Sequence, residues 1–191
     1  IEIDGVDIRD VKQKELREKI GYIPQKGVLF SGTIESNLKY GSSDADMKDL
    51  KMASDIAQAS EFIEAKPDKY NSEISQGGTN VSGGQKQRLS IARALVKKPE
   101  IYIFDDSFSA LDFKTDSKLR KAIKENIKDA TMIIVAQRIS TIKDANQIIV
   151  LDEGEVVGMG THRELLANCE VYKQIALSQL SKEELMSWVI I

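Results

Sequence analysis

The chain has 191 residues, 41% of them hydrophobic and 30% charged, with a formal net charge of −3. This composition is typical of a soluble globular protein with one domain, or with a core and a small subdomain. The basic residues are dispersed, which argues against a nucleic-acid surface, and no apolar run reaches the roughly 18–20 residues of a membrane-spanning helix. Cys169 is the single cysteine, so the sequence contains no disulfide framework and favours a cytosolic, reducing setting.

The first elements that the sequence predicts are short. Residues 1–8 alternate apolar and polar side chains around Asp4-Gly5, which predicts a strand followed by a turn. Residues 11–20 are charged and favour a helix, and residues 20–23 predict a strand that ends at a loop containing Gln25.

A longer helix is predicted over residues 46–62, with Asp44 as a candidate cap. Its apolar side chains recur at helical spacing on one face: Met47, Leu50, Ala53, Ile56 and Ala57. The Lys66-Pro67-Asp68 segment ends this unit, and residues 70–79 are rich in turn-forming residues.

Residues 80–112 are the most informative stretch of the chain. Val81-Ser82-Gly83-Gly84-Gln85 predicts a glycine loop that enters a helix, with Ser82 as the N-cap and Pro99 as the stop. The apolar stripe of this helix is formed by Leu89, Ile91, Ala92 and Leu95. Such a junction presents backbone N–H groups at the positive end of a helix dipole, and it therefore favours an anion, above all a phosphate.

Residues 101–104 form a short apolar run that is followed by Asp105 and Asp106. This pattern is typical of a buried parallel strand that delivers acidic side chains at its carboxyl end. A carboxylate in that position can hold Mg²⁺ directly or through water. A phosphate site and a metal-binding acid so close in sequence indicate nucleotide chemistry.

The remaining chain predicts further elements of both kinds. A charged helix is expected over residues 115–127, and buried strands over residues 131–135 and 147–151. The later signals are a turn at Glu153-Gly154, a strand at 155–157, a helix capped by Thr161, terminal helices from Val171 onward, and an apolar stretch at 185–191 that carries no motif.

These motifs, in this order, resemble those of ATP-binding cassette (ABC) ATPases. Val81-Ser82-Gly83-Gly84-Gln85 is similar to the family's signature motif, Asp105 falls at the Walker B aspartate, and Ser109-Ala110-Leu111-Asp112 matches the D-loop. Residues 28–38, after Gln25, resemble the Q-loop region of exporter-type members. The resemblance implies an α/β fold of the P-loop ATPase type, with a mostly parallel sheet and an all-helical signature subdomain.

The resemblance also implies roles for individual residues. It assigns Asp105 to Mg²⁺, Gln25 to Mg²⁺ and the attacking water, and Asp112 to the dimer interface. The signature residues would contact the γ-phosphate of an ATP held by the opposite subunit: Ser82, Gly83, Gly84 and Gln85. The implied cofactors are therefore ATP and Mg²⁺.

The implied partners are a second ABC subunit and transmembrane domains, which place the protein at the cytoplasmic face of the cell membrane. The transmembrane domains would be reached through the Q-loop region, and residues 70–79 resemble the exporter loop that touches their coupling helices. Glu73 either contributes to that contact or is simply a solvated glutamate.

The sequence lacks one motif that the family carries. None of the twelve glycines is followed by lysine, so no Walker A phosphate loop is present, and Ile1 is not an initiator methionine. We therefore expect a piece of a longer protein, without the P-loop strand and helix and with an apolar face left exposed. The expected division is core at 1–26, helical subdomain at 27–98, core at 99–180 and tail at 181–191.

Two positions depart from the catalytic pattern of the family. Asp106 stands where the family has glutamate, and Gln137 stands at the histidine of the switch loop. Aspartate is one methylene shorter, and an amide cannot carry a proton or a positive charge. The only histidine, His162, lies in a different stretch, where the family commonly has one. The pair resembles the degenerate-site subunit of heterodimeric multidrug exporters.

Two other hypotheses stay open on the sequence. The 191 residues alone would be a non-enzymatic piece that binds no ATP, even though the parent is an ABC-type ATPase. A chromosome-maintenance type of ABC ATPase shares the signature and Walker B motifs, but it predicts heptad coiled coils, and the sequence shows no sustained heptad.

Overall fold

The computed structural model describes residues 1–180. The tail expected at 181–191, with its apolar stretch at 185–191, lies outside the described residues. The chain divides into two compact units, Ile1–Val135 and Ala136–Ile191, and each is described here by itself. Among the described residues, no helix combines the length and apolar character needed to cross a bilayer.

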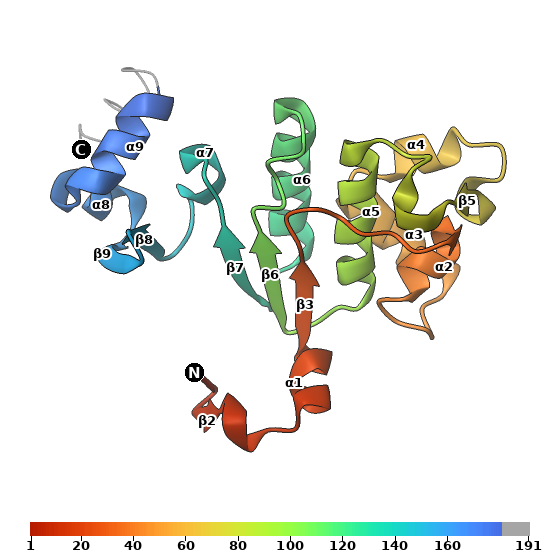
Figure 1. The fold of residues 1–191 in the computed structure, drawn as a ribbon, viewed down its shortest axis with the longest axis horizontal. Helices are drawn as coiled ribbons and strands as arrows, with labels where there is room; N and C mark the ends of the chain where they lie inside the picture. The colour runs from red at the N-terminus through yellow and green to blue at the C-terminus, as the bar shows by residue number, and fades with distance from the viewer. Residues whose placement is uncertain (181–191) are drawn as a thin grey trace. The chain divides into compact units, whose positions relative to one another are not determined.

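The first unit contains a central sheet and a group of helices (Figure 1). Its strands are β1 (Glu2–Ile3), β2 (Val6–Asp7), β3 (Ile20–Ile23), β4 (Gly32–Thr33), β5 (Glu73–Ile74), β6 (Ile101–Asp105) and β7 (Thr131–Val135). Its α-helices are α1 (Gln13–Lys19), α2 (Ile34–Lys39), α3 (Met47–Ile56), α4 (Ser60–Glu64), α5 (Gly83–Val96) and α6 (Phe113–Asn126). Short 3₁₀ turns lie at Ile8–Asp10, Lys69–Asn71 and Gln76–Gly78.

The central sheet is parallel, with β6 between β3 and β7. Phe104 of β6 is in register with Ile23 of β3 and with Ile134 of β7. The remaining strands of this unit form short antiparallel pairs, β1 with β2 and β4 with β5. The α/β fold class predicted from the sequence is confirmed, and β6 brings its two terminal carboxylates to the carboxyl edge of the sheet.

Helix α5 connects the sheet to the smaller helices. It lies beside β3 and contacts α2 and α3 (Figure 1). Leu89 and Ile91 of α5 share one buried core with Ile23 and Phe104 of the sheet. The helix ends at Val96, three residues before Pro99, because proline cannot donate a helical hydrogen bond.

The helix predicted over residues 46–62 is two helices, which corrects the prediction. Gln58 adopts a left-handed backbone with φ 57° between α3 and α4. The Ala59 N–H donates to the Ser54 carbonyl at 2.8 Å, the bond that closes a helix C-terminus of this kind. Arg88 of α5 donates to the Gln58 carbonyl at 2.6 Å, so a tertiary contact fixes the break.

The predicted cap of α3 was wrong: the helix is capped by Asp46 and not by Asp44. The Asp46 carboxylate accepts the Asp49 N–H at 2.9 Å, and the Asp49 side chain accepts the Asp46 N–H at 3.4 Å. This reciprocal capping box requires an acceptor three residues after the cap. Asp44 lies too far from the helix start to form it.

The second unit is a hairpin with helices: α7 (Ile139–Ile142), β8 (Ile148–Asp152), β9 (Glu155–Gly160), α8 (His162–Asn168) and α9 (Glu170–Gln179). The hairpin turn predicted at Glu153-Gly154 is confirmed, since both residues have positive φ. Thr161 caps α8 as predicted by accepting the Glu164 N–H. Tyr172, Leu165 and Val150 belong to the buried core of this unit.

Two strands predicted to be buried are only partly so. In β7 the side chains of Ile133 and Val135 are about half exposed, and in β8 Ile149 and Leu151 are more than half exposed. Alternate residues of β8, Ile148 and Val150, are buried. Exposed apolar side chains therefore occur on strands of both units.

Candidate functional site

The glycine loop at residues 81–85 forms the start of α5 as predicted. The Ser82 hydroxyl accepts the Gln85 N–H at 3.2 Å, and the Gln85 side chain accepts the Ser82 N–H at 3.0 Å. The N–H groups of Gly83 and Gly84 occupy the first helical positions, where no carbonyl of the helix can accept them. This end of α5 therefore offers donors at the positive end of a helix dipole.

Packing among residues 1–180 does not explain the two glycines. A Cβ added to Gly83 would meet nothing within 4 Å, and one added to Gly84 would meet only the Ala110 carbonyl at 3.8 Å. Ser82 and Gly83 are exposed. The bare backbone thus faces outward, as it must if another molecule is to approach it closely. The contact with Ala110 also places this loop beside the 109–112 segment.

The two carboxylates of the β6 end have different neighbours. Asp105 is half-buried, and its carboxylate accepts the Tyr22 hydroxyl at 2.8 Å. This hydrogen bond is the main reason that the pKa of Tyr22 is raised above its ordinary value. A bond from a neutral phenol leaves Asp105 other lone pairs for a cation. Tyr22 was missed by the sequence argument, because only the strand register, which pairs Tyr22 with Ile103, puts its side chain on the same face of the sheet as Asp105.

Asp106 is buried, with 9% of its surface exposed, and its backbone is left-handed with φ 44°. Its N–H donates to the Val135 carbonyl at 2.9 Å. The Gln25 amide donates to its carboxylate at 3.0 Å. The structure thus brings Gln25 to Asp106 across 81 positions of sequence and beside Asp105, a grouping that the sequence implied only through resemblance.

Asp112 caps α6. Its carboxylate accepts the Thr115 N–H at 3.0 Å, and this backbone bond is the main cause of its lowered pKa. Asp112 is exposed. These contacts explain Asp112 as a helix cap.

Gln137 belongs to the second unit and follows the end of β7 by two residues. Its side chain is exposed, and its carbonyl accepts the Gln179 amide at 2.8 Å. His162 is not available to replace it. That imidazole is buried, and its Nδ1 lies 2.7 Å from the Tyr172 hydroxyl, in the core of the second unit.

The residues present fit a magnesium–phosphate ligand. Among residues 1–180, no group of three or more His, Cys, Asp or Glu side chains could hold a metal ion by itself. Mg²⁺ does not need one, because it commonly takes one or two carboxylates and completes its shell with water and phosphate oxygens. Asp105 and the neighbouring Gln25 and Asp106 supply oxygen ligands of that kind.

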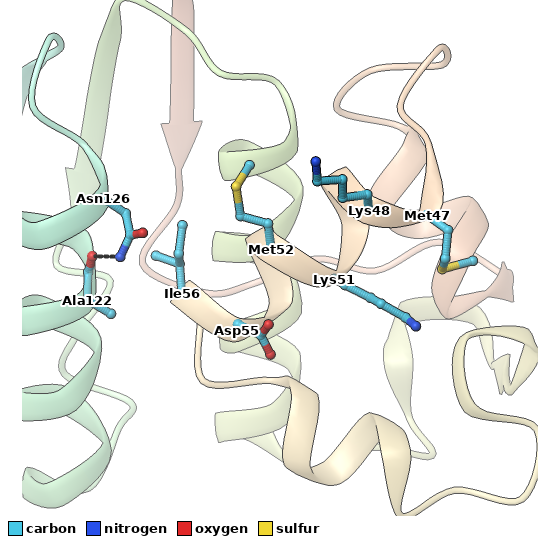
Figure 2. Close-up of a pocket in the computed structure, with 8 residues that line it drawn as sticks. All are labelled: Met47, Lys48, Lys51, Met52, Asp55, Ile56, Ala122 and Asn126. Carbon is cyan, nitrogen blue, oxygen red and sulfur yellow. Dashed lines mark hydrogen bonds between the residues drawn. The ribbon is translucent and has the colours of Figure 1, made fainter.

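A groove lies elsewhere in the first unit, between α3 and α6 (Figure 2). It has a volume of about 660 Å³ and is lined by Met47, Lys48, Lys51, Met52, Asp55, Ile56, Ala122 and Asn126. None of these residues belongs to the glycine loop or to the carboxylate group. The candidate site instead comprises the exposed start of α5 and the carboxyl edge of the sheet.

The chain belongs to the ABC transporter family, whose model matches residues 1–109. It is a nucleotide-binding domain of that family. It is 44% identical over 180 residues to an uncharacterized ABC transporter ATP-binding protein of Mycobacterium bovis, covering 93% of this chain and 31% of that protein. It is 43% identical over 184 residues to the beta-(1-->2)glucan export ATP-binding/permease protein NdvA of Rhodopseudomonas palustris, covering 96% of this chain and 31% of that protein.

A solved structure of a bacterial Atm1-family ABC exporter with ATP bound has the same fold. The TM-score is 0.90 at 38% sequence identity, and the match covers 94% of this chain and 32% of that one. The chain thus spans about a third of the length of the proteins that it resembles.

Proposed function

We propose that the chain is the ATP-binding domain of an ABC exporter subunit, which couples ATP binding and hydrolysis to export across a membrane. The observation that carries this proposal is the pairing of two sites in one unit. One is the exposed helix start at Ser82 and Gly83, and the other is the group formed by Gln25, Asp105 and Asp106. Exporters named among the relatives support it.

The two sites take different parts in the proposed activity. Asp105 would hold Mg²⁺, which when bound neutralises charge on the phosphates, and Gln25 would hold Mg²⁺ and orient water. The glycine loop would contact an ATP held mainly by a second ABC subunit, through Ser82, Gly83, Gly84 and Gln85. Asp112 lies two residues after Ala110, whose carbonyl is near Gly84, and would join the same interface.

We further propose that the chain's own catalytic site is degenerate. A carboxylate one methylene short sits about an ångström from its working place, and a misplacement of that order can cost roughly a hundredfold in rate. The left-handed backbone of Asp106 and its bond from Gln25 hold the short side chain near the sheet edge. Gln137 can donate a hydrogen bond but cannot transfer a proton as histidine can.

The loop after Gln25 offers a surface for transmembrane domains, and the proposed helical subdomain at 27–98 carries it. Val28, Phe30 and Tyr40 are exposed, and the two rings lie 4.7 Å apart. Arg93 of α5 packs over both rings and donates to the Val28 carbonyl at 2.9 Å. An apolar patch fixed in this way suits a protein contact at the cytoplasmic face of the membrane.

The degenerate site is tested in the complete transporter with its partner subunit. The double change Asp106→Glu with Gln137→His should raise hydrolysis at this chain's own site by about tenfold or more. Each single change serves as the control and should give a smaller gain. Hydrolysis that stays at the original level in the double variant would contradict the proposed degeneracy.

A further inference from the structure

Gln87 is a buried polar side chain on the apolar side of α5, with 1% of its surface exposed. Its amide makes two hydrogen bonds to the loop after β3. The Nε2 group donates to the Pro24 carbonyl at 3.0 Å, and the Oε1 atom accepts the Gly27 N–H at 2.8 Å. Buried amide groups in proteins nearly always have hydrogen-bond partners. Here the backbone of the loop provides one acceptor and one donor for the Gln87 amide.

These two bonds bracket the Gln25-Lys26 dipeptide. The loop also lies in direct contact with α5, because a Cβ at Gly27 would fall 2.9 Å from the Lys86 carbonyl and 3.1 Å from Ser90 Cβ. On its other side, the Gln25 amide donates to Asp106, and the Ser107 hydroxyl donates to the Ile23 carbonyl at 2.8 Å. The loop is therefore held between α5 and the β6 end.

Gln87 stands two residues after Gln85, in the second turn of the helix that begins at the glycine loop. We propose that Gln87 is a positioning residue that couples the helix start at residues 82–85 to Gln25. A shift of α5 toward a ligand at its N-terminus would move the Pro24 carbonyl and the Gly27 N–H with it. The identity of that ligand rests on the proposed function. The two hydrogen bonds of Gln87 to Pro24 and Gly27, called here the Gln87 clamp, do not depend on it.

The amide chemistry allows the clamp to be separated from simple packing. Methionine has a similar length but neither donates nor accepts well, while a glutamate carboxylate accepts from Gly27 and cannot donate to Pro24. Ser90→Ala is a matched control, because Ser90 is buried on the same face of α5 and touches the same loop. Glutamate keeps the shape of glutamine, so a role in packing alone would leave Gln87→Glu like the original protein.

The first measurement is hydrogen exchange of the full-length protein without nucleotide, followed in peptides that cover residues 24–28. Gln87→Met and Gln87→Glu should both exchange about tenfold faster than the original protein there, because each leaves the Pro24 carbonyl without a donor, and Ser90→Ala should match the original protein. If Gln87→Met does not fold, the faster exchange of Gln87→Glu decides. Unchanged exchange in whichever of these variants folds overturns the clamp.

The second measurement adds MgATP to the full-length transporter with its partner subunit. In the original protein, ATP should slow exchange at residues 82–88 and also at 24–28. In the Gln87 variants the first response should remain and the second should be lost. Equal responses at 24–28 in all proteins overturn the coupling, while no response at 82–88 in the original protein overturns the proposed function and leaves the result of the nucleotide-free experiment intact.

Discussion

Two loops of the molecule are each held by one glutamine amide, and they differ in burial. In the first unit, Gln87 donates to the Pro24 carbonyl and accepts the Gly27 N–H. In the second unit, Gln179 donates to the Gln137 carbonyl at 2.8 Å and accepts the Ile139 N–H at 2.9 Å. Gln87 is buried and Gln179 is exposed.

The difference in burial shows why similar hydrogen bonds contribute differently to stability. Water can replace an exposed amide at little cost, whereas a buried carbonyl and N–H that lose their partner retain the full penalty of desolvation. A buried glutamine therefore holds the loop of Gln25, and an exposed glutamine bonds the loop of Gln137. We therefore expect removal of the Gln87 amide to lower the free energy of unfolding more than removal of the Gln179 amide.

The largest effect is expected for Gln87→Met compared with Gln179→Met. The first change should lower the free energy of unfolding by about 2–4 kcal/mol, since it leaves two partly buried backbone groups unpaired, and the second by less than about 1 kcal/mol. Denaturant unfolding followed by circular dichroism would measure both. Equal losses would show that the burial of Gln87 does not make its hydrogen bonds more stabilising than those of Gln179.

A substitution at Gly27, whose N–H donates to Gln87, should weaken the Gln87 clamp by pushing the loop away from α5. In Gly27→Ala the added Cβ would press on the Lys86 carbonyl, and overpacking of this kind costs about 1–3 kcal/mol. Gly83→Ala is the control for stability, since its Cβ meets open space. It should unfold like the original protein and nevertheless weaken the response to ATP at the helix start. A Gly27→Ala protein of unchanged stability would contradict the close approach.

Much of this arrangement could be predicted from the sequence, because the signals were local. The strand at 20–23, the caps Ser82 and Thr161, and the turn at Glu153-Gly154 depend on short-range periodicity and on side chains that bond nearby backbone. The fold class followed from the resemblance of the ordered motifs to those of ABC ATPases.

What could not be predicted depends on contacts between distant segments. Gln58 carries no turn signal, and its left-handed conformation is stabilised by Arg88 from another helix. The clamp by Gln87 had one visible sign, a polar residue four positions before Ile91 on the apolar side of α5. The grouping of Gln25 with Asp106 required the sheet register.

The smallest effect is expected from pH in the second unit. Burial, followed by the nearby Lys143 charge, lowers the pKa of His162 below its ordinary 6.5, while Asp144 acts in the opposite direction. The unfolded chain then binds the proton more readily, so this group's stabilising effect is complete above about pH 6.5 and decreases as the pH falls toward the lowered value. Hydrogen exchange at 148–166 should accelerate between pH 7 and 5.5 after correction for intrinsic rates. His162→Asn should reduce this dependence, and the same pH dependence in that variant would exclude His162 as its source.

The central proposal is that the chain supplies an intact phosphate-contacting loop and has a weakened catalytic site of its own. Steady-state hydrolysis by the complete transporter with its partner subunit tests it most directly, with Gly84→Asp compared with Asp106→Asn. We predict that Gly84→Asp lowers the total rate by about tenfold or more, because a carboxylate would repel phosphate at the helix start, and that Asp106→Asn changes it by less than about twofold. A large loss with Asp106→Asn and little loss with Gly84→Asp would contradict the account.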